Sequence, residues 1–363
     1  MADLPLAFED WEARARKNLT RERFSYVSAV AGQSGAVDEN NKELRKWRLI
    51  PRVLRDTSGR TTSTEVLGVK LAVPVMLAPI RGLAYIREKG EEICAGAAAK
   101  CEVPLILSNL ASATPEVVAK LMGNIPHFFQ LYPCNDNEVI GSLIHRAELS
   151  GYRGIFMTID MSGHAIQYSG PRTTEYEEYG NDVYLSDPVF QSRLKEAPTR
   201  DRQAALEKIR QLRRAYFTWE DVRRISSTTK LPVVLKGILR QDDAKEAIEH
   251  GASGIVVSNH GGRSLDGTVP SISMLPAIRE VIENRLAVFF DGGIRSGSDV
   301  LRALALGADA VLMGRAYAYA LAAAGEDGVV SMLKTVIREM DSALATCGCS
   351  SVRELNESFV IRT

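Results

Sequence analysis

Neither sign of charge is in excess in this sequence. Its 45 Lys and Arg residues equal its 45 Asp and Glu residues, and charged residues make up 25% of the chain. A protein that binds nucleic acid or an anionic membrane surface mainly by charge needs a surplus of basic residues. We therefore expect neither a nucleic-acid partner nor a membrane partner.

Cysteines are few, and long apolar runs are lacking. The five cysteines are scattered, and the one Cys-x-Cys pair has no second pair or histidine nearby, which argues for reduced thiols and against a metal site. Residues Met1 to Pro5 carry an early acid and lead into no apolar leader, and no stretch approaches the length of a membrane span. We expect a soluble, cytoplasmic protein.

The sequence does contain eight short apolar runs, separated by segments with a helical pattern. Continuous Val, Ile, Leu and Phe in such runs is typical of parallel strands that are covered on both faces. Eight strand-and-helix units predict a TIM (β/α)8 barrel, which fits a single domain spanning residues 1–363. The runs are 74–78, 104–108, 127–131, 154–160, 232–236, 254–258, 287–291 and 309–314. The helices between them are predicted over 91–101, 115–122, 136–150, 219–227, 242–250, 274–282 and 298–306.

Two segments lie outside this alternation. Residues 1–73 are predicted to be an N-terminal helical extension, whose first amphipathic helix, over 7–19, is expected to act as a lid. Residues 161–231 are predicted to form a long loop or lid that ends in the fourth helix. Both loop packing and substrate contact stay open for the tyrosines of this loop, which are Tyr168, Tyr176, Tyr179 and Tyr184.

The most informative stretch follows the sixth run. It reads Ser258-Asn-His-Gly-Gly-Arg-Ser-Leu-Asp-Gly267, so that His260 and Arg263 leave one strand end together. A neutral imidazole is the usual proton acceptor near pH 7, and a guanidinium can hold a carboxylate with two parallel hydrogen bonds. A polar capping loop is the alternative. We interpret the pair as a base and a carboxylate anchor, which predicts proton abstraction from a bound carboxylic acid.

The last two strand ends have the composition of a phosphate site. The seventh run ends in Asp291-Gly-Gly-Ile-Arg-Ser-Gly297 and the eighth in Met313-Gly-Arg315. Their glycines leave backbone N–H groups free for an anion, and barrels commonly hold phosphate at these two loops. Lys236 after the fifth run favours an anionic cofactor ring, as in a reduced flavin. The alternatives are tight turns with surface arginines and a Schiff-base role for Lys236.

Polar side chains also occupy the other strand ends. Ser108, Gln130 and Thr158 are neutral groups that suit the carbonyls and nitrogens of a cofactor ring. Tyr132 follows Gln130 closely, and Asp160 could orient His260 and stabilise its imidazolium. Because active groups of barrels gather at the carboxyl ends of strands, we expect these side chains to share one site.

Three stretches resemble the FMN-dependent 2-hydroxy-acid oxidase and dehydrogenase family, which includes glycolate oxidase, lactate oxidase and mandelate dehydrogenase. They are Ser-Asn-His-Gly-Gly-Arg-x-Leu-Asp at 258–266, Asp-Gly-Gly-Ile-Arg-x-Gly-x-Asp at 291–299 and Leu-Gly-Ala-Asp-Ala-Val-Leu-Met-Gly-Arg at 306–315. The resemblance covers nearly the whole chain. It implies FMN as the cofactor, a small 2-hydroxy acid as the substrate and a homotetramer.

The resemblance also implies a role for each matching residue. His260 corresponds to the base with Asp160 as its partner, and Arg263 corresponds to the carboxylate anchor. Tyr26 and Tyr132 correspond to phenols that contact the substrate, and Lys236 to the lysine near N1 and O2 of the flavin. The other cofactor-binding positions are Pro79, Ile80, Ser108, Gln130, Thr158, Ser258, Gly261, Asp291, Gly293, Arg295, Gly314 and Arg315.

Four positions depart from the pattern of the family. Arg81 stands where a small residue is usual, Leu110 where a large aromatic residue can line the pocket, and His164 where an apolar residue is common. Gln167 replaces the second active-site arginine. We hypothesise that Arg81 and His164 make the pocket more cationic, so that the substrate carries an extra polar or anionic group. Alternatively, Arg81 points to solvent or pairs with an acid such as Glu88.

The predicted function is the FMN-dependent oxidation of a 2-hydroxy acid to the 2-oxo acid. The electron acceptor is O2 or another carrier. Two other functions stay open, namely a redox-neutral FMN-dependent isomerase and the same fold acting on a modified peptide or amine. Hydride transfer and a carbanion route use the same residues, so the sequence does not distinguish them.

Overall fold

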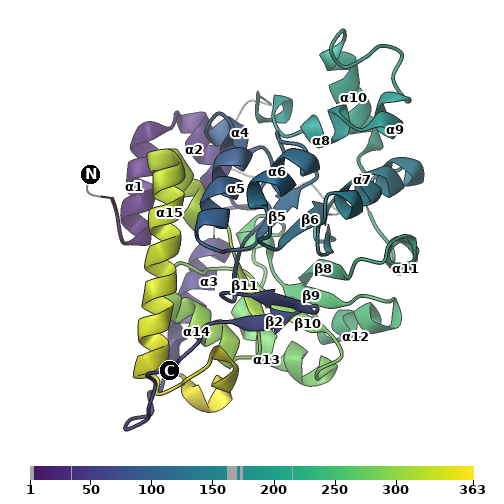
Figure 1. Cartoon of the computed structure of the whole chain (residues 1–363). Helices are drawn as coiled ribbons and strands as arrows, with labels where there is room; N and C mark the ends of the chain where they lie inside the picture. Colours follow the sequence, from purple (N-terminus) through teal and green to yellow (C-terminus); the bar gives the residue numbers. More distant parts are fainter. Residues whose placement is uncertain (1–3, 34, 162–169, 172–174, 215) are drawn as a thin grey trace.

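Eight parallel strands close into a barrel at the centre of the computed structural model (Figure 1). The first barrel strand pairs with the last, with Val75 opposite Val311, which confirms the predicted TIM barrel. The structure describes residues 4–33, 35–161, 170–171, 175–214 and 216–363. The barrel strands are β4 (Val75–Leu77), β5 (Leu105–Ser108), β6 (His127–Leu131), β7 (Ile155–Thr158), β8 (Val233–Ile238), β9 (Gly254–Val257), β10 (Ala287–Phe290) and β11 (Ala310–Met313).

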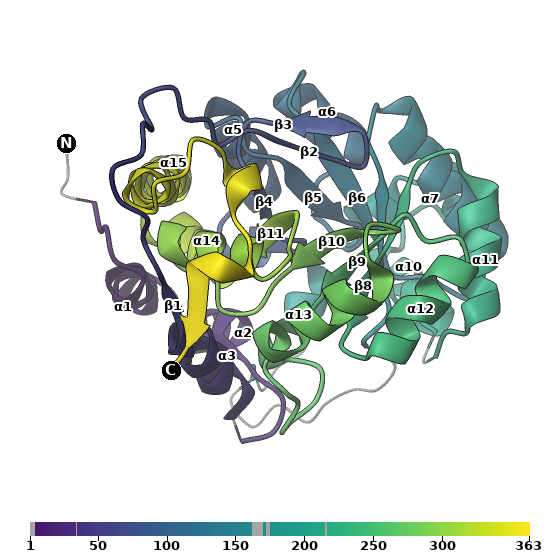
Figure 2. The ribbon, with the colours of Figure 1, turned by 90° about the horizontal axis from the view of Figure 1, so that it is seen from below.

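The interior of the barrel is filled by apolar side chains and closed at one end by a hairpin. Phe128, Phe156 and Phe289 are fully buried there, and successive rings meet edge to face. The hairpin of β2 (Thr64–Val66) and β3 (Val69–Leu71) can be followed in Figure 2, and its buried Val66, Val69 and Leu71 belong to the same cluster. Since β3 ends just before β4 begins, the hairpin covers the amino ends of the strands and leaves the carboxyl ends for a site.

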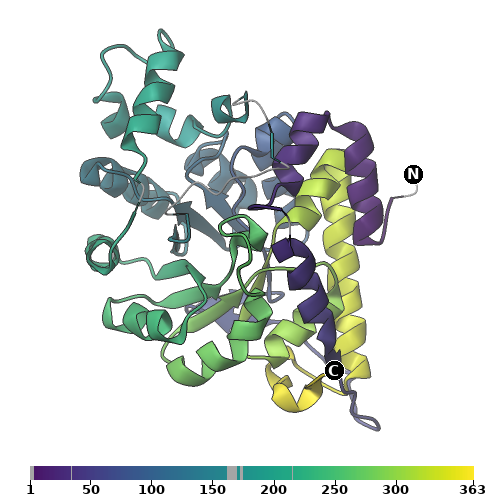
Figure 3. The same cartoon turned by 180° about the vertical axis from the view of Figure 1, so that it is seen from behind.

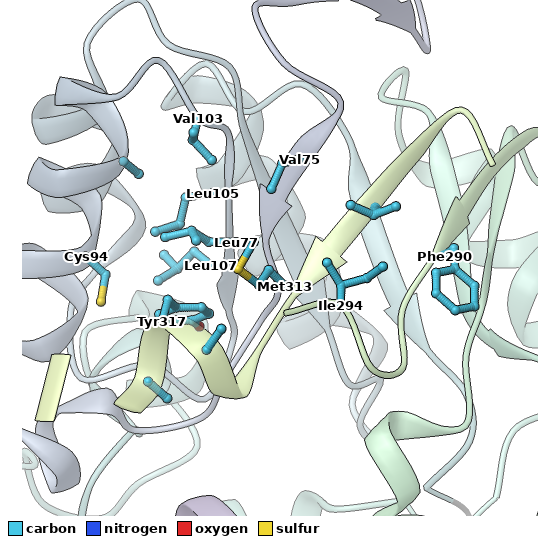
Figure 4. Packing of buried hydrophobic residues seen from close by; sticks show 14 of the residues in the cluster. Val75, Leu77, Cys94, Val103, Leu105, Leu107, Phe290, Ile294, Met313 and Tyr317 are labelled. Carbon is cyan, nitrogen blue, oxygen red and sulfur yellow. The ribbon is translucent and has the colours of Figure 1, made fainter. Parts of the chain in front are cut away.

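Helices surround the strands and bury the outward-facing side chains. Leu77, Leu105 and Leu107 lie between the strands and two helices, from which Cys94 and Tyr317 project (Figure 4). The helices are α5 (Gly90–Lys100), α6 (Pro115–Met122), α7 (Asn137–Leu149), α11 (Trp219–Thr228), α12 (Gln241–Glu249), α13 (Ser271–Ile282), α14 (Gly297–Ala305) and α15 (Arg315–Thr346). In the described part of the chain, no helix has the length and apolar composition that crossing a bilayer requires.

The N-terminal extension packs against the barrel domain and does not form a separate domain. It contains α1 (Phe8–Asn18), α2 (Arg21–Ser28), α3 (Gly35–Lys46) and β1 (Trp47–Leu49), and β1 pairs with the C-terminal β12 (Val360–Arg362). The expectation that the first helix is a lid is wrong, because α1 lies along α15 (Figures 1 and 3) and buries Phe8 and Trp11. The extension also contains a hairpin, so it is not purely helical.

The insertion between β7 and β8 is less loop-like than predicted. Its described residues form a 3-10 helix, η1 (Glu175–Glu178), and α8 (Asp182–Leu185), α9 (Pro188–Gln191) and α10 (Arg202–Leu212), which stand at the top of Figure 1. In α10, Leu206, Ile209 and Leu212 are buried at helical spacing, a pattern that the polar start of the insertion hid. His164, Gln167 and Tyr168 lie outside the described residues.

Candidate active site

His260 and Asp160 meet across the mouth of the barrel, as predicted. His260 Nδ1 lies 2.9 Å from Asp160 Oδ1. A carboxylate that accepts the Nδ1 proton leaves Nε2 as the acceptor for a second proton. Burial alone would raise the pKa of Asp160, but the nearby His260 and Lys236 hold that pKa below its usual value. Asp160 therefore stays ionised and can stabilise a His260 imidazolium.

The backbone around His260 adopts a left-handed turn. His260, Gly261 and Gly262 have φ angles of 56°, 62° and 75°, so the two glycines permit a turn that is costly for most residues. Asn259 and Asn40 of α3 exchange two side-chain amide hydrogen bonds of 2.8 and 2.9 Å, and this pair fastens the turn to the N-terminal extension. Sequence reasoning missed the pair, because its members lie far apart in the chain.

Arg263 is held by the carboxyl end of α2. Its Nη1 donates to the carbonyl oxygens of Tyr26 (3.0 Å), Val27 (3.2 Å) and Ala29 (3.1 Å). The C-terminus of a helix carries partial negative charge, which suits a guanidinium. Arg263 Cζ lies 5.9 Å from the centroid of the Tyr26 ring, so the structure brings together the predicted anchor and one predicted phenol.

The two predicted phenols come from different elements and lie close enough to interact electrostatically. The Tyr26 hydroxyl, from α2, donates to the carbonyl of Arg81 at 2.5 Å. Tyr132 follows β6, and Asn109 fixes its backbone by accepting from its N–H (3.2 Å) and donating to its carbonyl (3.1 Å). Burial raises the pKa of both phenols, so both stay protonated at neutral pH. Tyr132 can donate to a ligand, whereas Tyr26 must first release the Arg81 carbonyl.

A buried hydrogen-bonded chain crosses three neighbouring strands. Ser108 donates to Gln130 Oε1 at 2.8 Å, and Gln130 Nε2 donates to the Thr158 hydroxyl at 3.0 Å. All three residues were predicted to contact the cofactor ring, and all three are buried. Because each side chain fixes the next, the chain presents donors and acceptors in one orientation.

Lys236 belongs to a second buried network. Its Nζ lies 2.9 Å from Asp291 Oδ2 and 3.0 Å from Ser258 Oγ, which in turn donates to Asp291 Oδ1 at 2.5 Å. Burial would lower the pKa of Lys236, but Asp291 and Asp160 raise it above its usual value. An ammonium group this well stabilised does not suit Schiff-base chemistry, which needs a neutral amine, and it fits the predicted place beside an anionic ring.

The start of α15 offers an uncapped helix end for a phosphate. Gly314 has no side-chain cap among the described residues, and a Cβ built on it would meet its nearest neighbour, Ala78 Cβ, at 3.9 Å. Backbone N–H groups at such an end favour an anion. Arg315 donates to three carbonyl oxygens, those of Val27, Ala29 and Gly261. Burial, Arg263 and Arg295 lower the pKa of Arg315 to about 10, so the charges here are not balanced and fit a dianion.

Other predicted cofactor residues lie around this end of the barrel. Arg295 Cζ stacks on the Phe8 ring at 3.9 Å, so its guanidinium is turned toward α1. Gly293, with φ 99°, packs against Asn40 of α3. Pro79 and Ile80 are half-buried directly after β4.

Two residues that were predicted to line the substrate pocket, Leu110 and Arg81, lie in the segments after β5 and β4. Leu110 is half-buried, and its carbonyl accepts from Gly82 at 3.0 Å. Arg81 is also half-buried, and its Nη2 donates to the carbonyl of Glu177 at 3.4 Å. Arg81 therefore does not point to solvent, and the acid near it is Glu177 rather than Glu88.

Sequence reasoning also missed a buried acid. Glu91, in α5, accepts through Oε1 from the backbone N–H groups of Leu83 (2.9 Å) and Ser112 (3.0 Å), which belong to the loops after β4 and β5. Burial raises the pKa of Glu91 to about 7. An acid among the small residues of Gly90–Lys100 was the available signal.

Comparison with known proteins identifies relatives over the whole chain. A model of the family described as FMN-dependent dehydrogenase matches residues 15–362. The 4-hydroxymandelate oxidase of Amycolatopsis orientalis is 37% identical over 97% of this chain and 98% of the relative. The 2-hydroxyacid oxidase 1 of Mus musculus is 34% identical over 98% and 96%, and the L-lactate oxidase of Lysinibacillus sphaericus is 32% identical over 99% and 94%.

Solved structures agree with these relatives. A structure of mandelate oxidase superposes with a TM-score of 0.85 at 36% identity and covers 97% of both chains. A mandelate oxidase variant with (S)-mandelic acid superposes with a TM-score of 0.86 at 35% identity and covers 99% of both chains. The chain therefore belongs to the FMN-dependent 2-hydroxy-acid oxidase and dehydrogenase family, and it is an FMN-dependent oxidoreductase that acts on CH–OH groups.

Proposed function

We propose that this enzyme oxidises a 2-hydroxy acid to the 2-oxo acid, with His260 as the base and Arg263 as the carboxylate anchor. The 2.9 Å contact between His260 Nδ1 and Asp160 Oδ1 carries this proposal. It orients the imidazole and leaves Nε2 to accept a proton from the substrate. Asp160 then stabilises the imidazolium without taking the proton itself.

The other side chains of the site would bind the substrate and orient it. The substrate carboxylate would lie against Arg263, Tyr26 and Tyr132, whose N–H and O–H groups stabilise its negative charge. Burial of Tyr26 and Tyr132 supports a water-poor pocket, in which these hydrogen bonds are stronger than in bulk water. A carboxylate fixed in this way presents the substrate hydroxyl and α-carbon to His260.

FMN fits the two buried networks and the start of α15. When bound, FMN supplies the acceptor for the two electrons of the oxidation. The chain of Ser108, Gln130 and Thr158 would hold its ring, and Lys236 would balance negative charge on the ring. The free N–H groups after Gly314, together with the Arg315 charge, would hold its phosphate.

The finer parts of the function belong to this proposal as well. We propose a substrate with a further polar or anionic group, for which Arg81 and His164 were predicted to be responsible and Leu110 to line the pocket. The predicted homotetramer, the cytoplasmic location and the use of O2 or another acceptor stay predictions. The names of oxidase relatives support O2.

Anaerobic mixing tests the proposed reaction. A 2-hydroxy acid should bleach the flavin absorbance of the wild type, and His260→Ala should slow bleaching by about 10²- to 10⁴-fold, the usual contribution of a general base. Turnover without net flavin reduction would favour the isomerase, and reduction by an amine alone would favour the amine alternative. Full-speed bleaching by His260→Ala would overturn the assigned base.

A further inference from the structure

Arg81 has one guanidinium edge, formed by Nε and Nη2, that makes a single long hydrogen bond in the described part of the chain. Its Nε is buried and has no hydrogen-bond partner among the described residues, and its Nη2 has only the long bond of 3.4 Å to the Glu177 carbonyl. A buried charged donor without a partner is costly, so this edge needs an acceptor.

The same edge binds carboxylates elsewhere in this chain. Arg60 Nε and Nη2 donate to the two oxygens of Asp341 at 2.8 and 2.6 Å. Arg146 Nε and Nη2 donate to the two oxygens of Glu116 at 2.9 and 3.0 Å. Nε and Nη2 of Arg81 are therefore the pair of donors that a planar carboxylate matches.

No acid among the described residues forms an ion pair with Arg81. The Glu177 carboxylate, although close, is bound by Arg210 at 3.1 Å and by Arg213 at 3.4 Å. Burial is the main cause that lowers the pKa of Arg81, Arg213 lowers it further, and Tyr26 and Glu177 oppose this shift. Arg81 therefore lies near a negative charge but is not hydrogen-bonded to a carboxylate in the described part of the chain.

Two tyrosines connect Arg81 to the proposed reaction centre. Arg81 Cζ lies 5.5 Å from the centroid of the Tyr176 ring, and Tyr176 stacks on Tyr26 with centroids 5.4 Å apart. On α2, Tyr26 also contacts Arg263, the proposed anchor of the first carboxylate. Two guanidinium groups thus share one pair of aromatic rings, which gives the pocket two places for anionic groups.

We infer that Arg81, held on Tyr176, binds a second carboxylate of the substrate and makes this enzyme selective for 2-hydroxydicarboxylates. The inference rests on the proposed function, because it assumes that Arg263 holds the carboxylate beside the reacting carbon. Arg81 is a specificity residue here, and Tyr176, from η1, positions it.

Matched substrates test this inference. Each 2-hydroxydicarboxylate of a chain-length series is paired with the 2-hydroxymonocarboxylate of equal carbon number, for example 2-hydroxybutanedioate with 2-hydroxybutanoate. In anaerobic flavin bleaching, the wild type should prefer at least one diacid by about 10-fold or more in reduction rate over Kd, since a charged hydrogen-bonded pair contributes that much. Arg81→Met should remove this preference and change the monoacid values less than threefold. Arg81→Lys should keep part of it.

Arg213, which binds the Glu177 carboxylate, provides the matched control. Arg213→Met weakens the hold on Glu177 but keeps Arg81, so it should preserve the diacid preference. Equal loss in Arg213→Met and Arg81→Met, or equal loss on diacids and monoacids in Arg81→Met, would show that Arg81 only fastens η1 to the pocket. A wild type without preference for any diacid would also overturn the inference.

Binding of non-oxidisable acids gives a readout that does not depend on turnover. Butanedioate and pentanedioate should perturb the flavin absorbance of the holoenzyme at about 10-fold lower concentration than butanoate and pentanoate, and Arg81→Met should abolish the difference. Equal affinities in the wild type would contradict the inference. If neither class of 2-hydroxy acid bleaches the flavin, the proposed function fails, whereas bleaching by monoacids alone defeats only the role of Arg81.

Discussion

The two halves of the barrel mouth differ in how completely their charged groups are paired. At the ends of β7 to β10, Lys236 pairs with Asp291 and His260 with Asp160, both at 2.9 Å, and Asp160 Oδ2 has no further partner among the described residues. At the ends of β4 and β5, Arg81 Nε and Glu91 Oε2 are buried without a partner in the described structure. We infer that the half with paired charges carries out the reaction. The half with unpaired buried groups determines which substrate binds.

The largest effect should come from Asp160, which orients the base. In Asp160→Asn the side chain keeps its shape, but it can no longer stabilise the imidazolium or hold one His260 tautomer. We expect the rate of flavin reduction to fall by about 10²- to 10⁴-fold. Rapid anaerobic mixing measures it. A fall below threefold would mean that the pair of His260 and Asp160 is only structural. It would also contradict the claim that the half with paired charges carries out the reaction.

Lys236→Met should mainly affect stability and cofactor binding. It leaves the Asp291 carboxylate without its ammonium partner, which typically costs about 3–5 kcal/mol for a buried pair. Chemical unfolding and the Kd of FMN measure the two losses. The exposed Lys70→Met, on the hairpin, is the control. Unchanged stability and FMN affinity would contradict the pairing described for this half.

Glu91→Gln tests the half of the barrel mouth that contains the unpaired groups. The pKa of Glu91 is about 7 in the folded state, above its ordinary value of 4.5, so folding favours the protonated form. Protonated Glu91 therefore adds to the free energy of unfolding below about pH 4.5, and this added stability is lost as the pH rises through 7. Glutamine mimics the protonated acid and should stabilise the fold by up to about 3 kcal/mol above pH 7, with no gain near pH 4.5.

The pH dependence of unfolding checks this prediction. The exposed Glu65→Gln is the control and should not change the curve. A loss of stability in Glu91→Gln at every pH would show that the carboxylate is favourable in the folded state, against the shift described.

Asn40→Ala should have the smallest effect of the four. It removes the two amide bonds to Asn259 and loosens the left-handed turn at His260. We expect a loss of about 1–3 kcal/mol in unfolding free energy and a smaller loss of flavin-reduction rate than in Asp160→Asn. The exposed Lys42→Ala, on the same helix, is the comparison variant. Identical effects at both positions would mean that the amide pair has no special role.

Much of the paired half could be predicted, because its residues occur in short continuous motifs. The run from Ser258 to Gly267 contains the predicted base, the anchor and the glycines of their turn, and the eight apolar runs predicted every barrel strand. The helix of residues Arg202–Leu212 could not be separated from the polar loop before it. Neighbours brought together only by folding, such as Asn40 with Asn259, leave no local signal.

The other half could be predicted only as a departure from a pattern. Arg81 stood out as a charge where a small residue is usual, but its stacking on Tyr176 depends on how the insertion folds back. The link from Glu91 to Leu83 and Ser112 likewise joins two loops that are separate in the sequence. Contacts between distant segments therefore determine the substrate side.

The separation of the two halves can be tested by one measurement. Anaerobic flavin reduction by 2-hydroxybutanedioate, followed over a range of concentrations, yields a limiting rate and a Kd for the wild type, Arg81→Met and Asp160→Asn. The account predicts that Arg81→Met raises the Kd about 10-fold or more with little change in the limiting rate, and that Asp160→Asn lowers the limiting rate by about 10²-fold or more with little change in the Kd. Equal changes of both constants in the two variants would contradict it.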